Sequence, residues 1–109
     1  MDIKLTATQR LQVTNVINQQ TGNAGELRTL NRIAAVIELT EAEQKAVKVR
    51  FEATAVMWDR EAADSHVAEI KLKKSDGDTL LKLLNSWGHF RRADSLWLDP
   101  LLEALEAAE

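Results

Sequence analysis

A motif that occurs twice constrains the fold most: an Ile-Lys-Leu tripeptide followed by two amphipathic helical patterns. The first tripeptide is Ile3-Lys4-Leu5 and the second is Ile70-Lys71-Leu72. The elements that follow them recur at nearly equal spacing, which favours a pseudo-repeat of residues 3–39 and 70–106. The other reading is that any two amphipathic helix pairs look alike. In either case the chain of 109 residues is expected to form a single small domain, 1–109.

Local signals mark the helices of the first third. Thr6-Ala7-Thr8-Gln9 has the spacing of a capping box, so a helix is expected from there to about Gln19. Gly22 can end it in the left-handed conformation, and Asn23 can cap the next helix. The second helix has one apolar stripe, formed by Leu27, Leu30, Ile33, Ala34 and Ile37.

The middle of the chain is ambiguous. Thr40-Glu41-Ala42-Glu43 is another capping box, and its helix could continue through residue 57. However, residues 47–57 also alternate between apolar and polar positions, which is typical of a strand. We favour a short helix and then a hairpin with strands near 48–58 and 67–72, joined by the polar stretch 59–65. In a continuous strand, Trp58 would lie on the face opposite Phe51 and Met57.

The last third predicts a second helix pair. Ser75-Asp76-Gly77-Asp78 is typical of a turn that leads into a cap, and Gly88 is expected to end the leucine-rich helix that follows. Asp94 or Asp99 could cap the final helix. Pro100 fits a first helical position after Asp99 but would strain a helix begun at Asp94. The predicted fold class is therefore α+β and mostly helical, with two helix-turn-helix hairpins flanking a short central β-hairpin. An all-α fold is the alternative if residues 41–57 form one helix.

The sequence predicts no catalytic, metal or cofactor site. It has no cysteine, and its two histidines, His66 and His89, lack partners at the spacing of metal ligands. Both histidines are expected to be exposed or hydrogen-bonded loop residues. No serine or threonine lies in a nucleophile-elbow context. We therefore expect a protein that is not an enzyme and needs no cofactor.

Charge and hydropathy limit the partners. The net charge is −3 and is spread along the chain, which disfavours nucleic-acid binding without excluding it. No apolar run approaches the roughly 20 residues that span a bilayer, and the first residues do not have the pattern of a signal peptide. We expect a cytoplasmic protein without membrane contact.

Four residues are candidates for an interface with a protein partner or a second copy. Trp58 is one, because tryptophan is enriched among interface hot spots, although its ring could also fold over the hairpin edge. The others are Phe90, Arg91 and Arg92, which put an aromatic ring and two guanidinium groups in one linker. Arginines there could bind phosphate or an acidic partner.

The second half of the chain resembles small uncharacterised proteins of tailed phages and prophages. The matching features are Trp58-Asp59, Ile70-Lys71-Leu72, a leucine helix over 80–87 and a terminal leucine helix over 96–105. The resemblance implies an accessory, assembly or host-modulating role and assigns no functional residue. The resulting hypothesis is a non-catalytic, self-associating protein–protein interaction module. The alternative is a helix-turn-helix regulator that binds nucleic acid through Arg91 and Arg92.

Overall fold

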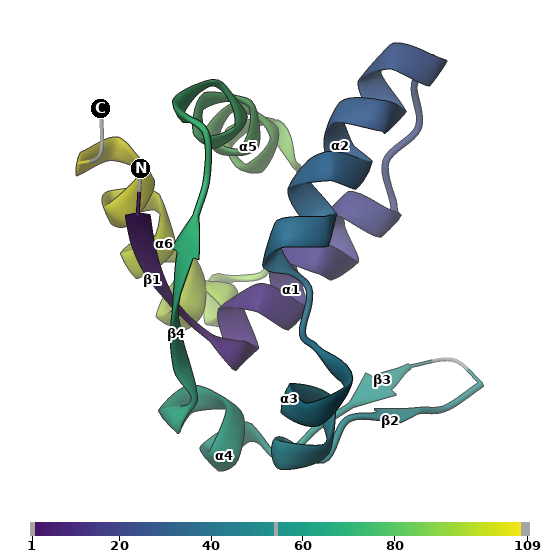
Figure 1. Ribbon diagram of the computed structural model, residues 1–109, viewed down its shortest axis with the longest axis vertical. Helices are drawn as coiled ribbons and strands as arrows, with labels where there is room; N and C mark the ends of the chain where they lie inside the picture. Colours follow the sequence, from purple (N-terminus) through teal and green to yellow (C-terminus); the bar gives the residue numbers. More distant parts are fainter. Residues whose placement is uncertain (1, 54, 108–109) are drawn as a thin grey trace.

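The computed structural model describes residues 2–53 and 55–107. The chain folds into helices that pack with one small antiparallel strand pair, while a second pair projects away from them (Figure 1). In chain order the elements are β1 Asp2–Thr6, α1 Ala7–Asn18, α2 Ala24–Ile37, α3 Glu41–Ala46, β2 Arg50–Phe51, β3 Val56–Met57, α4 Arg60–Ser65, β4 Val67–Lys71, α5 Lys74–Ser86, the 3-10 turn η1 Arg92–Asp94 and α6 Ser95–Ala107. The predicted α+β, mostly helical class is confirmed.

The two copies of the tripeptide pair with each other. β1 and β4 are antiparallel, with Ile3 opposite Ile70 and Leu5 opposite Ala68. Each strand leads into a helix pair, α1–α2 after β1 and α5–α6 after β4. The second helix of each pair packs on the strand and first helix of the other half: α2 packs on β4 and α5, and α6 packs on β1 and α1. This arrangement has the form that a repeat would give, and the pseudo-repeat itself stays a prediction.

The main core lies between this strand pair and the four long helices. The apolar stripe predicted for the second helix faces it except at Leu27, which is 36% exposed, because helical spacing puts the other members on one side of α2. The buried members of this core are Ile3, Leu5, Val13, Ile17, Ile33, Ile37, Ile70, Leu72, Leu80, Leu84, Trp97, Leu98, Leu101 and Leu105.

A middle segment, residues 40–66, forms a second and smaller core beneath α1 (Figure 1). Its buried residues are Ala7, Leu39, Val47 and Ala63. The short helix predicted at the second capping box is confirmed as α3. The strand pairing predicted for 48–58 with 67–72 is wrong. The chain reverses between β2 and β3, which pair with each other, and β4 pairs with β1 instead.

The polar stretch 59–65 is also a helix rather than a connection. Asp59 caps α4 by accepting a hydrogen bond from the backbone N–H of Ala62. A hydrogen bond from Thr8 to Asp64 then joins α4 to α1. The carboxylates that suggested a loop therefore act as a cap and as a helix-to-helix contact.

Two predictions about helix ends are wrong, namely the left-handed conformation at Gly22 and the turn at residues 75–78. Of the two starts considered for the last helix, the one after Asp94 is observed, and α5 ends at Ser86, just before Gly88. No described glycine, Gly22 and Gly88 included, has a positive φ, and the one described residue in the left-handed region is Lys48. Residues 75–78 lie inside α5, which begins at Lys74 without a side-chain cap. Pro100 lies inside α6, because that helix begins at Ser95. The carbonyl of Leu96, at the exposed start of α6, is the one that loses its helical donor there.

Asp76 holds α5 against α2 through an ion pair. Its carboxylate is buried and accepts two hydrogen bonds from Arg32, at 2.6 and 3.2 Å. These hydrogen bonds lower the pKa of Asp76 below its ordinary value, against the opposing effect of burial. Residue 76 is therefore a contact between the two helix pairs rather than a turn residue.

Arg10 joins the middle segment to the rest of the molecule. Its side chain is only 4% exposed, and its guanidinium makes a paired contact with the Glu43 carboxylate, at 2.6 and 3.1 Å. It also donates to the carbonyls of Ile37 and Glu38, at the end of α2. Glu43 further accepts from the backbone N–H of Thr40 and lies 2.8 Å from Nε2 of His66. One charged pair thus connects α1, α2, α3 and the end of α4.

Replacement of Glu43 by glutamine should reduce the free energy of unfolding by roughly 3 kcal/mol, because it leaves a buried guanidinium without its counter-charge. Glutamine can still complete the capping box at this position, so the change isolates the charge. The matched control is Glu41→Gln, two residues earlier and 88% exposed, which should cost less than about 0.5 kcal/mol. Urea denaturation at neutral pH measures both, and equal small losses would contradict the role of the pair.

The same pair should make stability depend on pH in the acid range. The hydrogen bonds from Arg10 hold the pKa of Glu43 far below its ordinary value of 4.5. A lowered pKa in the folded state stabilises the protein above the unfolded pKa, and this contribution is lost as pH falls toward the folded value. Between about pH 5 and pH 2, wild type should therefore lose more stability than Glu43→Gln. Parallel losses in the two proteins would contradict the assignment.

Candidate functional site

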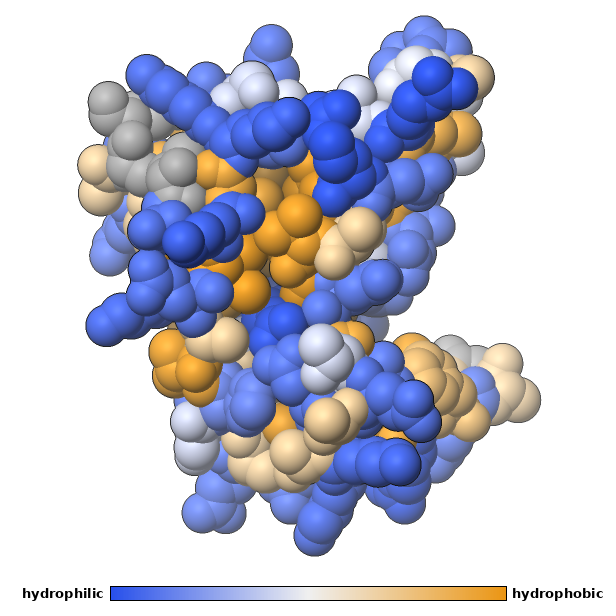
Figure 2. Space-filling view, in the orientation of Figure 1, coloured by the Kyte–Doolittle hydropathy of each residue, from blue (hydrophilic) through white to orange (hydrophobic). Residues whose placement is uncertain are grey.

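A groove of about 530 Å³ lies between α1 and the β2–β3 hairpin. In Figure 2 the molecule is hollowed on the right, between the lobe that carries α2 and the lobe that carries the hairpin. The groove is lined by Leu11, Gln12, Thr14, Asn15, Asn18, Glu38, Leu39, Gln44, Val49, Phe51, Ala55, Val56 and Trp58. It is the largest of the principal pockets found among the described residues, so it is the candidate functional site.

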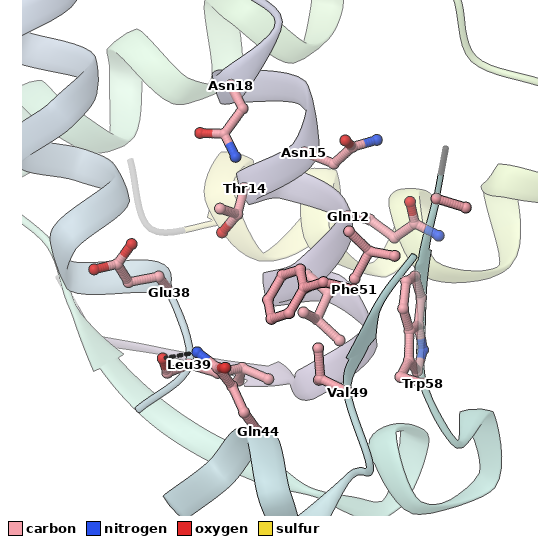
Figure 3. A pocket seen from close by; sticks show the side chains of 13 residues that line it. Gln12, Thr14, Asn15, Asn18, Glu38, Leu39, Gln44, Val49, Phe51 and Trp58 are labelled. Atoms are coloured by element: carbon pink, nitrogen blue, oxygen red, sulfur yellow. Dashed lines mark hydrogen bonds between the residues drawn. The ribbon is translucent and has the colours of Figure 1, made fainter. Parts of the chain in front are cut away.

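One face of the hairpin forms a wall of the groove. β2 and β3 pair with Phe51 opposite Val56, and continuing this register puts Val49 opposite Trp58. All four side chains line the groove, and Figure 3 shows Phe51 and Val49 reaching from the β2 side toward α1. The base of the hairpin is fixed by a backbone hydrogen bond of 2.8 Å from Asp59 to Val47.

The predicted orientation of Trp58 is wrong. Because the chain reverses between β2 and β3, Trp58 and Phe51 lie on the same face of the hairpin, not on opposite faces. Trp58 is half-buried and packs against the core of the middle segment, while Met57 is exposed. The role of Trp58 as an interface residue stays a prediction.

Phe51 is the exposed aromatic residue of this site, and it is not among the residues predicted from the sequence. Its side chain is 74% exposed, and those of Val56 and Met57 are 41% and 43% exposed. Space-filling colours show apolar residues gathered over the hairpin (Figure 2). The sequence held no signal for this exposure, because an apolar residue between two charged neighbours, Arg50 and Glu52, is also the pattern of a half-buried strand.

Amide side chains from α1 and α3 supply the polar part of the groove. Gln12 and Asn15 project from α1, and Gln44 donates to the carbonyl of Leu39 across the groove floor, at 3.2 Å (Figure 3). Glu38 is the one ionisable residue in the lining as described. Uncharged donors and acceptors around an apolar floor suit contact with a polypeptide better than contact with phosphate.

Phe90 belongs to a different place. It packs edge-on against Trp97, with ring centroids 5.7 Å apart, and is half-buried against the main core. It lines a smaller pocket of about 140 Å³ together with Trp87 and His89, whose rings are 4.8 Å apart. This pocket shares Gln12 and Asn15 with the groove, so the two hollows flank the same face of α1.

Arg91 and Arg92 are exposed in the linker before α6. The backbone N–H of Arg91 donates to Asp94 at 2.7 Å, and Asp94 in turn accepts from the Trp97 indole. Neither arginine lines the groove. The alternative hypothesis of a nucleic-acid-binding regulator, which relied on these two side chains, stays a prediction.

The two histidines lie apart from the groove. His66 follows α4 and contacts Glu43, and His89 lies against Trp87. Within residues 2–53 and 55–107, no cluster of His, Cys, Asp or Glu side chains could hold a metal ion. In the same part of the chain, no helix combines the length and apolar character needed to cross a membrane.

Comparison with known proteins identifies no relative. No protein-family model matches the chain, and neither the curated proteins nor the solved structures include a match. These comparisons do not bear on the resemblance of the second half to phage and prophage proteins, which stays a prediction.

The two aromatic residues of the groove should differ in their effect on stability. Trp58→Ala should reduce the free energy of unfolding by about 2 kcal/mol, because it removes half-buried packing from the smaller core. Phe51→Ala should change it by less than about 0.5 kcal/mol, because that ring is mostly exposed. Denaturant titrations measure both, and a larger loss for Phe51→Ala would show that its ring supports the fold.

Proposed function

We propose that the chain is a non-catalytic protein–protein interaction module that self-associates through the β2–β3 hairpin and the groove beside it. The observation that carries the proposal is the exposure of Phe51, 74%, at the mouth of that groove. An exposed aromatic ring that contributes little to its own fold is a residue type that interfaces use as an anchor.

The shape of this face favours a second copy as the partner. It carries both a projection, the apolar hairpin, and a hollow, the groove next to it. In a two-fold dimer each copy presents the same patch, so a surface that has both features can complement itself. A second copy bound to this face would remove part of the exposed Phe51 side chain from water.

The groove lining supports the same proposal. Its leucine, valine and tryptophan side chains provide an apolar centre, and its amides provide hydrogen-bond partners around it. An apolar centre with a polar rim is the usual anatomy of a protein interface. A phage accessory, assembly or host-modulating protein would be one setting for such a module.

Sedimentation velocity over a concentration series tests the proposal. Wild type should shift from monomer toward dimer between about 1 µM and 1 mM, and Phe51→Ser should remain monomeric because it removes the anchor. Leu96→Ser is the matched control, since Leu96 is 82% exposed on α6 and does not line the groove. This control should dimerise like wild type. A wild type that stays monomeric throughout the series would overturn the proposal.

A further inference from the structure

The outer edge of β2 has backbone groups that β3 does not use. The N–H of Glu52 donates to the carbonyl of Ala55 at 2.8 Å, which makes residues 52 and 55 a hydrogen-bonded pair. In antiparallel strands such pairs alternate with non-hydrogen-bonded pairs, so Phe51, opposite Val56, belongs to the second kind. The N–H and C=O of Phe51 therefore point away from β3. An exposed edge of this kind is a template for another strand.

The side chains along this edge complement themselves. Arg50, Phe51 and Glu52 are all exposed, and neither charge makes an ion pair among the described residues. If a second β2 lies antiparallel and centred on Phe51, Arg50 of each copy is opposite Glu52 of the other. The two Phe51 rings are then directly opposite each other. A parallel arrangement would instead put like charges side by side, which is destabilising.

We propose that two copies of the chain pair through their β2 edges about a two-fold axis at Phe51. This deepens the proposed self-association and rests on it. The two hairpins join into one four-stranded sheet in the order β3–β2–β2–β3. Mutual hydrogen bonds between the two Phe51 backbones and two Arg50–Glu52 pairs, one on each side of the axis, hold the central strands together.

The same pairing joins the apolar faces of the two hairpins. Phe51 and Val56 of each copy lie on the face that lines the groove, so the dimer carries one continuous apolar strip between two grooves. The charged side chains lie on the opposite face, because successive residues of a strand alternate. Lys48 and Asp59 pair within one copy, because Nζ of Lys48 and Oδ2 of Asp59 are 4.0 Å apart at the base of the hairpin.

β2 fits this role better than the other edge of the hairpin. β3 consists of Val56 and Met57 and has no charge that could fix the direction or register of a partner strand. In β2, by contrast, a two-fold rotation about Phe51 puts the positive Arg50 of each copy opposite the negative Glu52 of the other. This charge order is the reason for choosing a second copy over an unrelated peptide as the partner.

Charge reversal on the two positions tests the pairing by sedimentation equilibrium of the full chain. Arg50→Glu and Glu52→Arg, each alone, should weaken dimerisation by about tenfold or more, because both cross-strand pairs become repulsive. An equimolar mixture of the two variants should recover the wild-type affinity as a mixed dimer. The double variant R50E/E52R should dimerise by itself, because it restores opposite charges in reversed order. These four results together would establish the register.

Lys82→Glu on α5 is the matched control for net charge, since it changes the charge of −3 by the same amount as Arg50→Glu. It should leave the dimer unchanged. If wild type dimerises and the single reversals bind as tightly as wild type, or if the mixture fails to recover, the β2 pairing is overturned while self-association stands. If wild type is monomeric at every concentration, the proposed function and the pairing both fail.

Discussion

The contact between Arg10 and Glu43 is the interaction on which the shape of this molecule most depends. Arg10 is on the first helix, yet its guanidinium is directed toward the middle segment and is enclosed by the carbonyls that end α2. Burying a guanidinium is unfavourable unless its donors are matched, and here Glu43 and two carbonyls match them. The pair thereby holds α3 against α1, and residues 47–49 lead from α3 into β2. The position of the hairpin relative to α1, and so the groove itself, depends on this charged contact together with the smaller core.

The residues that hold the hairpin in place are different from the residues that it exposes. The main core, formed by the long helices around β1 and β4, does not include the hairpin, and the smaller core takes only its base, through Val47, Val49 and Trp58. The outer part of the hairpin, with Phe51, Val56 and Met57, is therefore free to contact another molecule. A small core that holds a hairpin by one end explains why the most exposed aromatic residue of the described chain lies there.

The helix caps were predictable from the sequence, whereas the pairing of distant strands was not. The caps at Thr6, Asn23 and Thr40 were predicted and are present, because each depends on residues three positions apart. The strand at 67–71 was also predicted, but its partner was not. Pairing with β1 joins residues more than sixty positions apart, and alternation within one strand holds no information about which other strand lies beside it.

The candidate site was predictable only in part, for the same reason. Trp58 was selected and does line the groove, but the turn between β2 and β3 reverses the face on which it lies. Phe51 was missed because its exposure depends on that turn. Arg10 offered no local signal, since a charged residue on a helix is usually exposed, and its burial depends on a glutamate in another helix. The face of Trp58, the exposure of Phe51 and the burial of Arg10 all depend on contacts between residues that are distant in the sequence or separated by a turn.

Amide hydrogen exchange of Phe51, followed by NMR at several protein concentrations, shows whether the outer edge of β2 is open in the single chain and closed by a second copy. The backbone N–H of Phe51 should exchange rapidly in dilute solution and become protected as concentration rises, while the amides of the main core do not change. Exchange of the Phe51 amide at one rate across the whole range would show that no second copy closes this edge.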